Sequence, residues 1–459
     1  DGSYASHRLG TTNVNAIRYF PEDVVDGKTN HGCFIKTSNA SQILLFRSTR
    51  DEGWTGFEND VPMSYSYGTA AVNDNYLVIK ASYRDSYQCY DLTSRSFLRT
   101  LTIDESSGQQ ILGLIPDSGT LVIGNGKEAA AETLELTTGE TVKTDLPYTP
   151  SDGYNSADIA ADSLVLLGGK LCYTVQSYNA ESTTLSDGTI IVNMGEDKVY
   201  CLWFLDLVDG TSTSVPLPGT YTGSDFAPII SVNPTATLAL VTTKRYDENY
   251  NSICQSTLLN LTTGTSIPIP DLAYGEYGEM PPFAWSENGD VAVVSTDGIR
   301  VWDKAGNCLA TIDPDGKNVL SLCFAPGDLQ LMAVCNDGSV YRYNVYGSLL
   351  NRLELYFYDT GLTRYTDFTW RFTDKGLLIT ADDVCTLIST EVWEPYAYVQ
   401  SFLHYDEASD SFLVSVGTEN GSVLGAYQRL TTADLIKMAE DILGENTLTQ
   451  EQRNKYGLD

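Results

Sequence analysis

Histidine is scarce in this chain of 459 residues, which contains only His7, His31 and His404. So few imidazoles, so far apart in sequence, argue against a histidine-based zinc site and against a serine triad. The sequence also lacks a G-x-S-x-G elbow before a helix, a P-loop and an H-E-x-x-H motif. We therefore expect no catalytic residues, no bound metal and no cofactor.

Basic side chains are also few: 28 Lys and Arg stand against 60 Asp and Glu, and the formal net charge is −32. Such a surface repels phosphate groups, so we expect no nucleic-acid partner and no attraction to anionic membranes. Two interpretations of the acidity stay open. It keeps the surface soluble, or it selects a partner by charge.

Long apolar runs and paired cysteines are missing as well. No stretch of about 18 apolar residues exists, so we expect no direct membrane insertion by this chain. The nine cysteines form no C-x-x-C pair, and most lie in apolar runs, as Cys201 and Cys323 do, so we predict buried, reduced thiols. Free thiols favour a cytoplasmic location, whereas the Tyr-, Ser- and Gly-rich composition favours export. We slightly favour the extracytoplasmic part of a membrane-anchored protein. Because the chain begins at Asp1, we expect it to be processed or part of a longer protein.

Short apolar runs recur along the chain, separated by turn residues such as Asn233-Pro234-Thr235 and Glu287-Asn288-Gly289-Asp290. Gly, Asn and Asp reach positive φ at low cost and Pro presets a turn, so each cluster closes a hairpin. Strand, turn and strand without long helical windows predict an all-β protein.

One pattern repeats about every 40 to 45 residues, which is the length of a four-stranded propeller blade. It is an apolar strand ending in a bulky residue, then a turn and a second apolar strand. We predict a single β-propeller, with eight blades favoured and seven as the alternative, and a short C-terminal helical tail. The longest interval is assigned to an extra segment, Lys170 to Asp187, inserted in the third blade. The bulky residues are Val72, Leu114, Ile159, Val232, Trp285, Phe324, Phe372 and Tyr405.

Two corners and one dipeptide carry a family resemblance. Phe324-Ala325-Pro326-Gly327-Asp328 and Trp285-Ser286-Glu287-Asn288-Gly289 resemble the Phe-Ser-Pro-Asp-Gly corner of WD-repeat proteins, and Trp302-Asp303 is similar to their closing dipeptide. The spacing matches over most of the chain, and the residues match in blades five and six. The family's Gly-His signature is absent. The resemblance implies a degenerate WD-like propeller.

The last blade has only three strands of its own within residues 402–429, so we expect the N-terminal part to donate the fourth. The candidate donors are Val14 to Phe20 and Gln42 to Arg47, and either would pair with Ser422 to Arg429. We therefore predict three regions in the chain. Residues 1–67 form an N-terminal segment with the ring-closing strand and an aromatic loop, 68–430 form the propeller, and 431–459 form a helical tail packed on it.

The tail begins with a helix whose apolar side chains, Leu435, Ile442 and Leu443 among them, share one face. The ending Leu448-Thr449-x-Glu451-x-Arg453-x-x-Tyr456-Gly457-Leu458 resembles the tail after C-terminal sensor propellers in bacterial multidomain signalling proteins. Those proteins are of Toll/interleukin-receptor or nucleotide-binding signalling types. The resemblance implies a sensor domain within a larger bacterial protein.

The connections from the second to the third strand, and from the fourth strand to the next blade, share one face of a propeller. Here they are the longer loops, rich in Tyr, Gly and acids. Tyrosine offers large contact area at low entropic cost, so these loops indicate a binding face; the alternative is that they fold back as packing. We expect several of the tyrosines to be exposed and Tyr274 and Tyr277 to be dispensable for stability. The candidate ligand-binding residues are Tyr154, Tyr221, Tyr246, Tyr250, Tyr274, Tyr277, Tyr358 and Tyr365.

Taken together, these features predict a non-enzymatic recognition or scaffold module that binds a protein or glycan and is monomeric as an isolated domain. The alternative is a glycan-cleaving or quinone-dependent propeller enzyme with carboxylates in the central funnel, for which acid pairs such as Asp382-Asp383 are available. The oxygen-rich loop Asp313 to Asn318 lacks the later bidentate Glu of a calcium loop, so we predict no metal there.

Overall fold

The computed structural model describes the strands at 14–19, 23–25, 28–37 and 43–48, residues 54–58, and residues 62–428 with short gaps. It divides into two compact units. The first comprises Asp1–Gly56, His404–Val414 and Leu424–Asp459, and the second Phe57–Leu403 and Ser415–Val423. The predicted tail helix lies outside the described residues. The gaps are at 65, 67, 83–84, 161, 185–189, 223–225, 247–251, 276–278, 328, 356–361 and 419–420.

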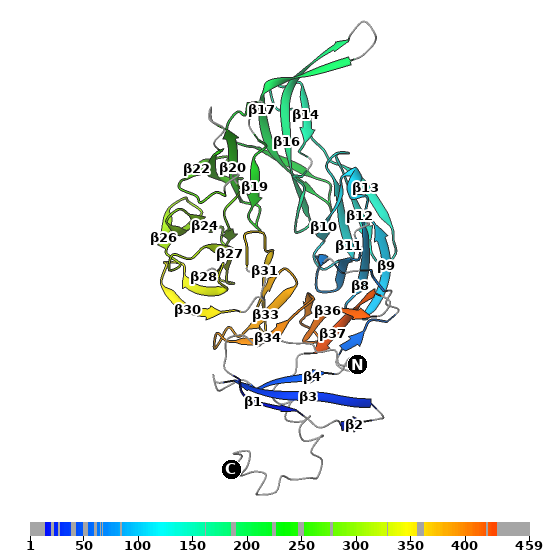
Figure 1. Ribbon diagram of the computed structural model, residues 1–459. Coiled ribbons are helices and arrows are strands. Elements are labelled where there is room, and N and C mark those ends of the chain that lie inside the picture. Colours follow the sequence, from blue (N-terminus) through cyan, green and yellow to red (C-terminus); the bar gives the residue numbers. More distant parts are fainter. Residues whose placement is uncertain are drawn as a thin grey trace. The chain divides into compact units, whose positions relative to one another are not determined.

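The prediction of an all-β propeller with eight blades is confirmed. In the second unit, antiparallel sheets follow one another around a ring, and each sheet is one blade (Figure 1). Within a blade the strands pair in sequence order, from the inner first strand to the outer fourth. The bulky residues of the repeat fall where the first strands end, as Val72 and Leu114 do.

Blades 1 to 4 begin at Thr69 and end at Ile269. Blade 3 has a fifth, short strand that pairs with its second strand. A short 3-10 helix, η1 (Glu105–Ser107), connects blades 1 and 2. The strands are β6 (Thr69–Val72), β7 (Tyr76–Lys80), β8 (Ser86–Asp91) and β9 (Ser96–Thr102); β10 (Gln109–Leu114), β11 (Thr120–Asn125), β12 (Ala130–Glu135) and β13 (Thr141–Asp145); β14 (Ser156–Ile159), β15 (Val165–Leu167), β16 (Lys170–Thr184), β17 (Ile190–Asp206) and β18 (Ser212–Pro216); and β19 (Ile229–Val232), β20 (Leu238–Tyr246), β21 (Ser252–Asn260) and β22 (Ser266–Ile269).

Blades 5 to 8 follow the same order, and the eighth takes its outer strand from the N-terminal part of the chain. Among the described residues, no helix has the length and apolarity needed to span a bilayer. The strands are β23 (Phe283–Trp285), β24 (Val291–Ser295), β25 (Gly298–Trp302) and β26 (Cys308–Ile312); β27 (Val319–Phe324), β28 (Gln330–Cys335), β29 (Ser339–Asn344) and β30 (Leu349–Glu354); β31 (Phe368–Thr373), β32 (Gly376–Ala381), β33 (Val384–Ile388) and β34 (Pro395–Val399); and β35 (Phe402–Asp406), β36 (Ser411–Thr418), β37 (Gly421–Gln428) and β5 (Trp54–Gly56).

Burial explains why the apolar runs sit where they do. The second strands are covered on both faces by neighbouring blades, so β28 and β32 read as nearly continuous apolar sequence and are almost wholly buried. The fourth strands form the rim, and β13 is exposed along most of its length. Between blades 5 and 6, Ile299 and Val301 pack with Leu331 in one core cluster, and all three are fully buried. The core therefore lies between the blades.

In five blades the third strand ends in the same turn, capped by Asp or Asn. A side-chain oxygen at the strand end accepts a hydrogen bond from a backbone N–H two or three residues later, as Asp303 does from Ala305 at 2.9 Å. Trp302-Asp303 is therefore one instance of a turn-capping position. The capping residues are Asp91, Asp206, Asn260, Asp303 and Asn344.

The prediction that Val14 to Phe20 or Gln42 to Arg47 completes blade 8 is wrong. The fourth strand is β5, whose Gly56 and Trp54 pair with Gly425 and Tyr427 of β37. The two predicted donors instead coincide with β1 (Val14–Tyr19) and β4 (Ile43–Ser48). These strands pair with β3 (Lys28–Thr37), which also pairs with β2 (Asp23–Val25), in a separate sheet of the first unit.

The second unit adds its own links between the blades at the ends of the repeat. Met63 and Ser422 exchange two backbone hydrogen bonds of 2.8 Å each. The Thr69 hydroxyl donates to the Leu403 carbonyl at 2.6 Å. Because the buried Met63 comes shortly before blade 1 and Thr69 begins it, these contacts tie that blade to the first and third strands of the eighth.

The extra segment predicted at Lys170 to Asp187 is not an insertion separate from the blade. Residues from Lys170 onward are the second strand itself, paired with β17 from Lys170 to Tyr178. The added length comes from a longer hairpin between the second and third strands. After a register shift at Tyr178/Ala180, the pairing continues from Ala180 to Thr184 against Met194 to Ile190.

Candidate binding face

The antiparallel order of the blades fixes which connections lie together. Connections between second and third strands, and those from a fourth strand to the next blade, leave the sheets at the same end. We call this end the loop face. Its longer parts are the connections at 103–108, 146–155, 217–228, 270–282, 313–318 and 355–367, with the ends of the β16–β17 and β20–β21 hairpins.

The predicted binding tyrosines differ in their surroundings. Tyr250, Tyr277 and Tyr358 lie outside the described residues. Tyr246 and Tyr365 are 44% and 76% exposed, whereas Tyr154 is half-buried. Tyr154 lies between β13 and β14, Tyr221 between β18 and β19, Tyr274 between β22 and β23, Tyr365 between β30 and β31, and Tyr246 ends β20 before its connection to β21.

Two of these tyrosines are packing residues. Tyr221 is 4% exposed and its ring meets Tyr200 edge to face, with centroids 4.8 Å apart. The Tyr274 hydroxyl lies 2.7 Å from the Ser256 hydroxyl, and burial raises the pKa of Tyr274. Its ring packs on the core between blades 4 and 5. Because its ring packs against that core, we expect replacement of Tyr274 to lower stability, in contrast to the prediction made from the sequence.

Tyr246 belongs to an exposed cluster that the sequence did not reveal. Its ring meets Phe226 edge to face at 5.3 Å, and the Lys244 ammonium lies 4.7 Å from the Phe226 ring centroid and 5.6 Å from that of Tyr246. The Phe226 N–H donates to the Lys244 carbonyl at 3.1 Å, which holds the loop against β20. Phe226 is 42% exposed. The alternation of a strand places Lys244 and Tyr246 on one side, but nothing local in the sequence points to Phe226.

Tyr365 lies in a second exposed cluster. The Arg364 guanidinium stacks on the Tyr365 ring at 4.8 Å and donates to its hydroxyl at 2.5 Å. The same guanidinium is 3.7 Å from the Glu279 carboxylate, which comes from the connection between blades 4 and 5. Gly275 donates its N–H to the Glu279 carbonyl at 2.9 Å. Two loops far apart in sequence thus hold one exposed tyrosine and its arginine.

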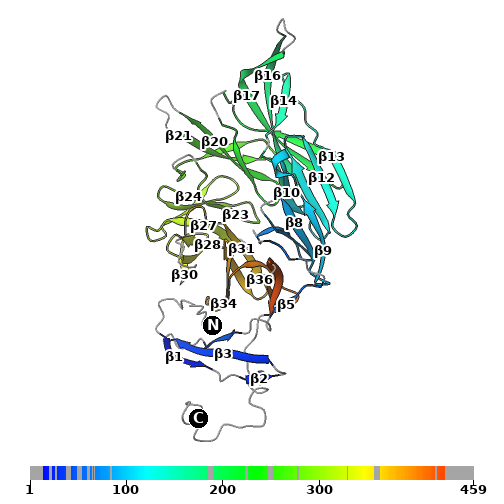
Figure 2. The ribbon, with the colours of Figure 1, turned by 45° about the vertical axis from the view of Figure 1, so that its right-hand side comes forward.

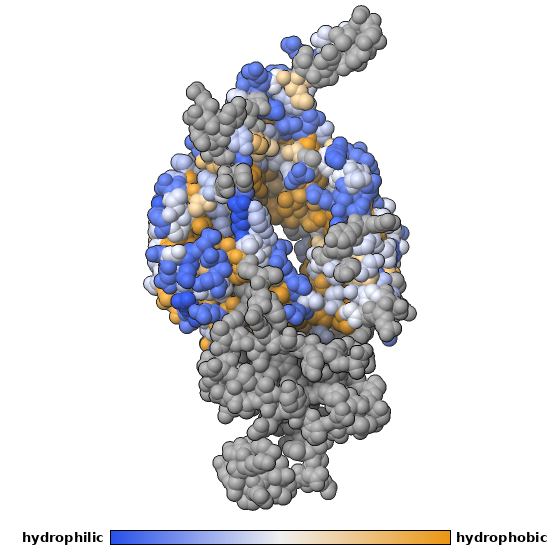
Figure 3. Space-filling view, viewed as in Figure 1, coloured by the Kyte–Doolittle hydropathy of each residue, from blue (hydrophilic) through white to orange (hydrophobic). Residues whose placement is uncertain are grey.

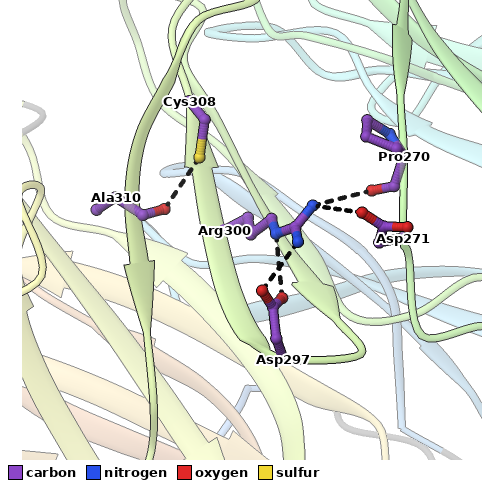
Figure 4. Close-up of polar contacts among 6 residues, drawn as sticks. All are labelled: Pro270, Asp271, Asp297, Arg300, Cys308 and Ala310. Atoms are coloured by element: carbon purple, nitrogen blue, oxygen red, sulfur yellow. Dashed lines mark hydrogen bonds and ion pairs between the residues drawn. The ribbon is translucent and has the colours of Figure 1, made fainter.

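The connection that carries Glu279 is anchored at its start by an arginine of the next blade. Arg300 of β25 donates two hydrogen bonds to the Asp297 carboxylate, at 3.0 and 2.8 Å, and one to Asp271 at 3.0 Å (Figure 4). These bonds lower the pKa of Asp297. Asp271 begins the connection from blade 4 to blade 5, and Arg300 belongs to blade 5. The Arg300 guanidinium therefore links blades 4 and 5 where this connection begins.

The strands around the axis offer few acidic groups. In the first strands of blades 1 to 7, Asp158 is the one carboxylate within the described residues. The Tyr178 hydroxyl donates to it at 2.5 Å, which raises the pKa of Tyr178 to about 12. Asp382 and Asp383 form the turn between β32 and β33 instead. Figure 3 shows the ring hollowed at its centre, with hydrophobic residues on part of the wall.

The oxygen-rich loop between blades 5 and 6 uses its carboxylates internally. Asp313 accepts the Gly316 N–H at 2.8 Å, and Asp315 accepts the Tyr341 hydroxyl at 3.0 Å. Lys317 donates to Asp337 at 2.6 Å; burial works against ionisation there, but this and other hydrogen bonds lower the pKa of Asp337 to about 2. Across the described part of the chain, no group of three or more His, Cys, Asp or Glu side chains is placed to hold a metal ion.

No protein-family model and no curated protein matches this sequence. Several solved WD40-type β-propellers resemble the fold remotely. Hsv2 of Kluyveromyces lactis is 11% identical, with 72% of this chain and 99% of that chain covered and a TM-score of 0.40. BamB of Moraxella catarrhalis is 11% identical over 82% and 96%, with a TM-score of 0.39. Sqt1 of Saccharomyces cerevisiae is 13% identical over 71% and 96%, with a TM-score of 0.39.

Proposed function

We propose that this chain is a non-enzymatic recognition module that binds a protein segment through the loop face, as the sensor part of a larger bacterial protein. The observation that carries the proposal is the pair of exposed clusters, Phe226 with Lys244 and Tyr246, and Glu279 with Arg364 and Tyr365. Exposed loops on a rigid scaffold are the usual location of binding residues. A glycan ligand is the second outcome that the test distinguishes.

The composition of the clusters supports binding. Tyrosine and arginine are the residues that most often dominate binding energy at protein interfaces. In both clusters a cation is already stacked on an aromatic ring, so less side-chain freedom is lost when a partner arrives. The scarcity of carboxylates in the first strands gives no support to the alternative of an enzyme with paired acids around the axis.

The test compares exposed tyrosines at opposite ends of the blades. Ligands are selected from a displayed peptide library and a printed glycan array, and their dissociation constants are measured for Tyr246→Ala and Tyr365→Ala. We expect each substitution to weaken binding about tenfold or more, since interface tyrosines often contribute over 1 kcal/mol. Melting temperatures should stay near that of the parent chain, because both side chains are exposed.

Tyr346 provides the matched control. It is 74% exposed, almost as much as Tyr365, but it lies in the turn between β29 and β30, at the other end of blade 6. Tyr346→Ala should leave binding unchanged. The proposal fails if neither library yields a ligand, or if Tyr346→Ala weakens binding as much as Tyr365→Ala does.

A further inference from the structure

The β16–β17 hairpin continues past the rest of its blade. Ala180 to Thr184 pair with Met194 to Ile190 after β14 and β18 have ended. We call these two paired stretches the hairpin extension. In Figures 1 and 2 it projects beyond the neighbouring strands of blade 3. Within the described part of the chain it is a two-stranded ribbon, so each of its strands has an edge that no third described strand covers.

Hydrogen bonds at Ala180 fix the direction of the backbone groups. The Asn155 side chain donates to the Ala180 carbonyl at 3.0 Å and accepts the Ala180 N–H at 2.7 Å. These groups of Ala180 therefore point away from β17. In an antiparallel pair, when one residue directs its N–H and C=O groups away from the partner strand, the residue directly opposite does the same. This outward direction recurs at every second residue. Met194, Val192 and Ile190 consequently direct their N–H and C=O groups to the outer edge of β17, and Ser182 and Thr184 direct theirs to the outer edge of β16.

The chain covers the outer edge of β17 as far as Lys198. β18 pairs with Cys201 to Leu205. Leu217 donates its N–H to the Tyr200 carbonyl at 2.8 Å, and Tyr221 exchanges backbone hydrogen bonds of 2.7 and 2.8 Å with Lys198. Beyond that point, within the described residues, no strand or loop pairs with the edge at Met194, Val192 and Ile190.

The uncovered edge is well suited to strand pairing. Ile190-Ile191-Val192-Asn193-Met194 carries no charge and contains three β-branched residues, which favour strands. Free edges in native proteins are commonly protected by lysine or proline, and this stretch has neither. Met194 is 60% exposed. The edge of β16 differs, because Asn155 already covers it at Ala180.

We propose that the outer edge of β17 at Ile190, Val192 and Met194 binds an extended segment of a partner protein as an added β-strand. Main-chain hydrogen bonds would supply the affinity in this mode of recognition. The proposal concerns a backbone edge and stands independently of the tyrosine clusters.

Charge defines the partner. The acidic side chains Glu181, Glu196 and Asp197 lie on or next to the extension, and the whole chain carries a net charge of −32. A second copy would bring the same acids to the edge, which is unfavourable. The geometry therefore points to a neutral or basic segment with strand-forming side chains.

A pair of proline substitutions tests the edge. Val192 and Ser182 are directly opposed and direct their N–H groups to opposite edges, so Val192→Pro and Ser182→Pro each remove one outward donor and no hydrogen bond within the hairpin. The probe is a fluorescent short peptide of alternating lysine and valine. We expect Val192→Pro to weaken its binding about tenfold or more and Ser182→Pro by less than about twofold.

Two further peptides separate pairing from charge. A peptide of the same charge with every backbone amide N-methylated should not bind, and a counterpart with glutamate for lysine should bind weakly. Three outcomes would each overturn the proposal. They are that the methylated peptide binds equally well, that the two proline substitutions have equal effects, or that the first peptide does not bind the parent chain. So would self-association in sedimentation that Val192→Pro abolishes, since that assigns the edge to a second copy. The Tyr246→Ala and Tyr365→Ala variants should bind the peptide normally, which keeps this test separate from that of the proposed function.

Discussion

At the scale of single residues, the partner of each tyrosine ring decides its role. Tyr221 and Tyr274 come from the same kind of connection as Tyr365, yet their rings pack inward while Tyr365 is 76% exposed. The sequence places all of them in Tyr-rich loops and does not separate them. The separation depends on contacts with residues from other strands, such as Tyr200 and Ser256.

Replacement of Tyr221 by alanine should therefore destabilise the fold. The change removes a buried ring and its contact with Tyr200, and a loss of about 3 to 5 kcal/mol in the free energy of unfolding is expected for a large aromatic side chain. Urea denaturation followed by tryptophan fluorescence measures this value. Tyr365→Ala is the control and should change stability by less than about 0.5 kcal/mol. Equal stability of the two variants would contradict the packing role assigned to Tyr221.

At the scale of elements, the repeat was predictable because it depends on local chemistry. Apolar strands, bulky strand ends and turn residues recur in each blade, and they identified the first strands from Val72 to Tyr405. From the sequence, only Trp302-Asp303 resembles a closing dipeptide. The same turn is capped by Asn260 and Asn344, because the turn requires a side-chain acceptor and accepts either Asp or Asn.

The ring-closing strand was not predictable in the same way. β5 has three residues, too few to show the alternation of a strand, whereas β1 and β4 have clear apolar patterns. Those patterns are satisfied by pairing with β3. The contact between Phe226 and Tyr246 was missed for a related reason: it joins a loop to a hairpin that follows it, and no spacing rule connects the two.

Two truncations separate β5 from the strands before it. Removal of residues 1–50 keeps Trp54–Gly56, so blade 8 retains its fourth strand and should remain assembled. Removal of residues 1–58 exposes the edge of β37 at Gly425 to Tyr427, and exposed edges promote aggregation. Size-exclusion chromatography and calorimetry should show a monomer for the first truncation and a less stable, aggregating species for the second. Aggregation of both to the same extent would contradict the assignment of β5.

At the scale of the whole molecule, charge governs which partners approach. With 60 acidic and 28 basic residues, the chain attracts cations over distances set by the ionic strength. Lys244 and Arg364 are then basic groups within acidic surroundings, each held on a ring of the loop face. A partner attracted by the overall negative charge therefore meets these two basic groups when it reaches the loop face.

When a basic peptide binds this chain, we therefore expect the salt concentration to change mainly the association rate constant. Raising sodium chloride from about 0.05 to about 0.5 M shortens the Debye length from about 14 to about 4 Å. We expect the association rate constant to fall several-fold and the dissociation rate to change little, because steering acts before contact. Stopped-flow fluorescence measures both rates. A salt-independent association rate would exclude charge as the selecting property.

The pairing of β5 with β37 also has a consequence for biosynthesis. The ribosome completes Trp54–Gly56 before any blade, but Gly425 to Tyr427 emerge only after the seventh blade has been made. Blades 1 to 7 take all of their strands from consecutive sequence and can assemble as they emerge. Trp54–Gly56 must therefore remain unpaired until β37 has been synthesised. Blade 8 is thus the last to form, and the time before it closes is the period in which a chaperone would have most to protect.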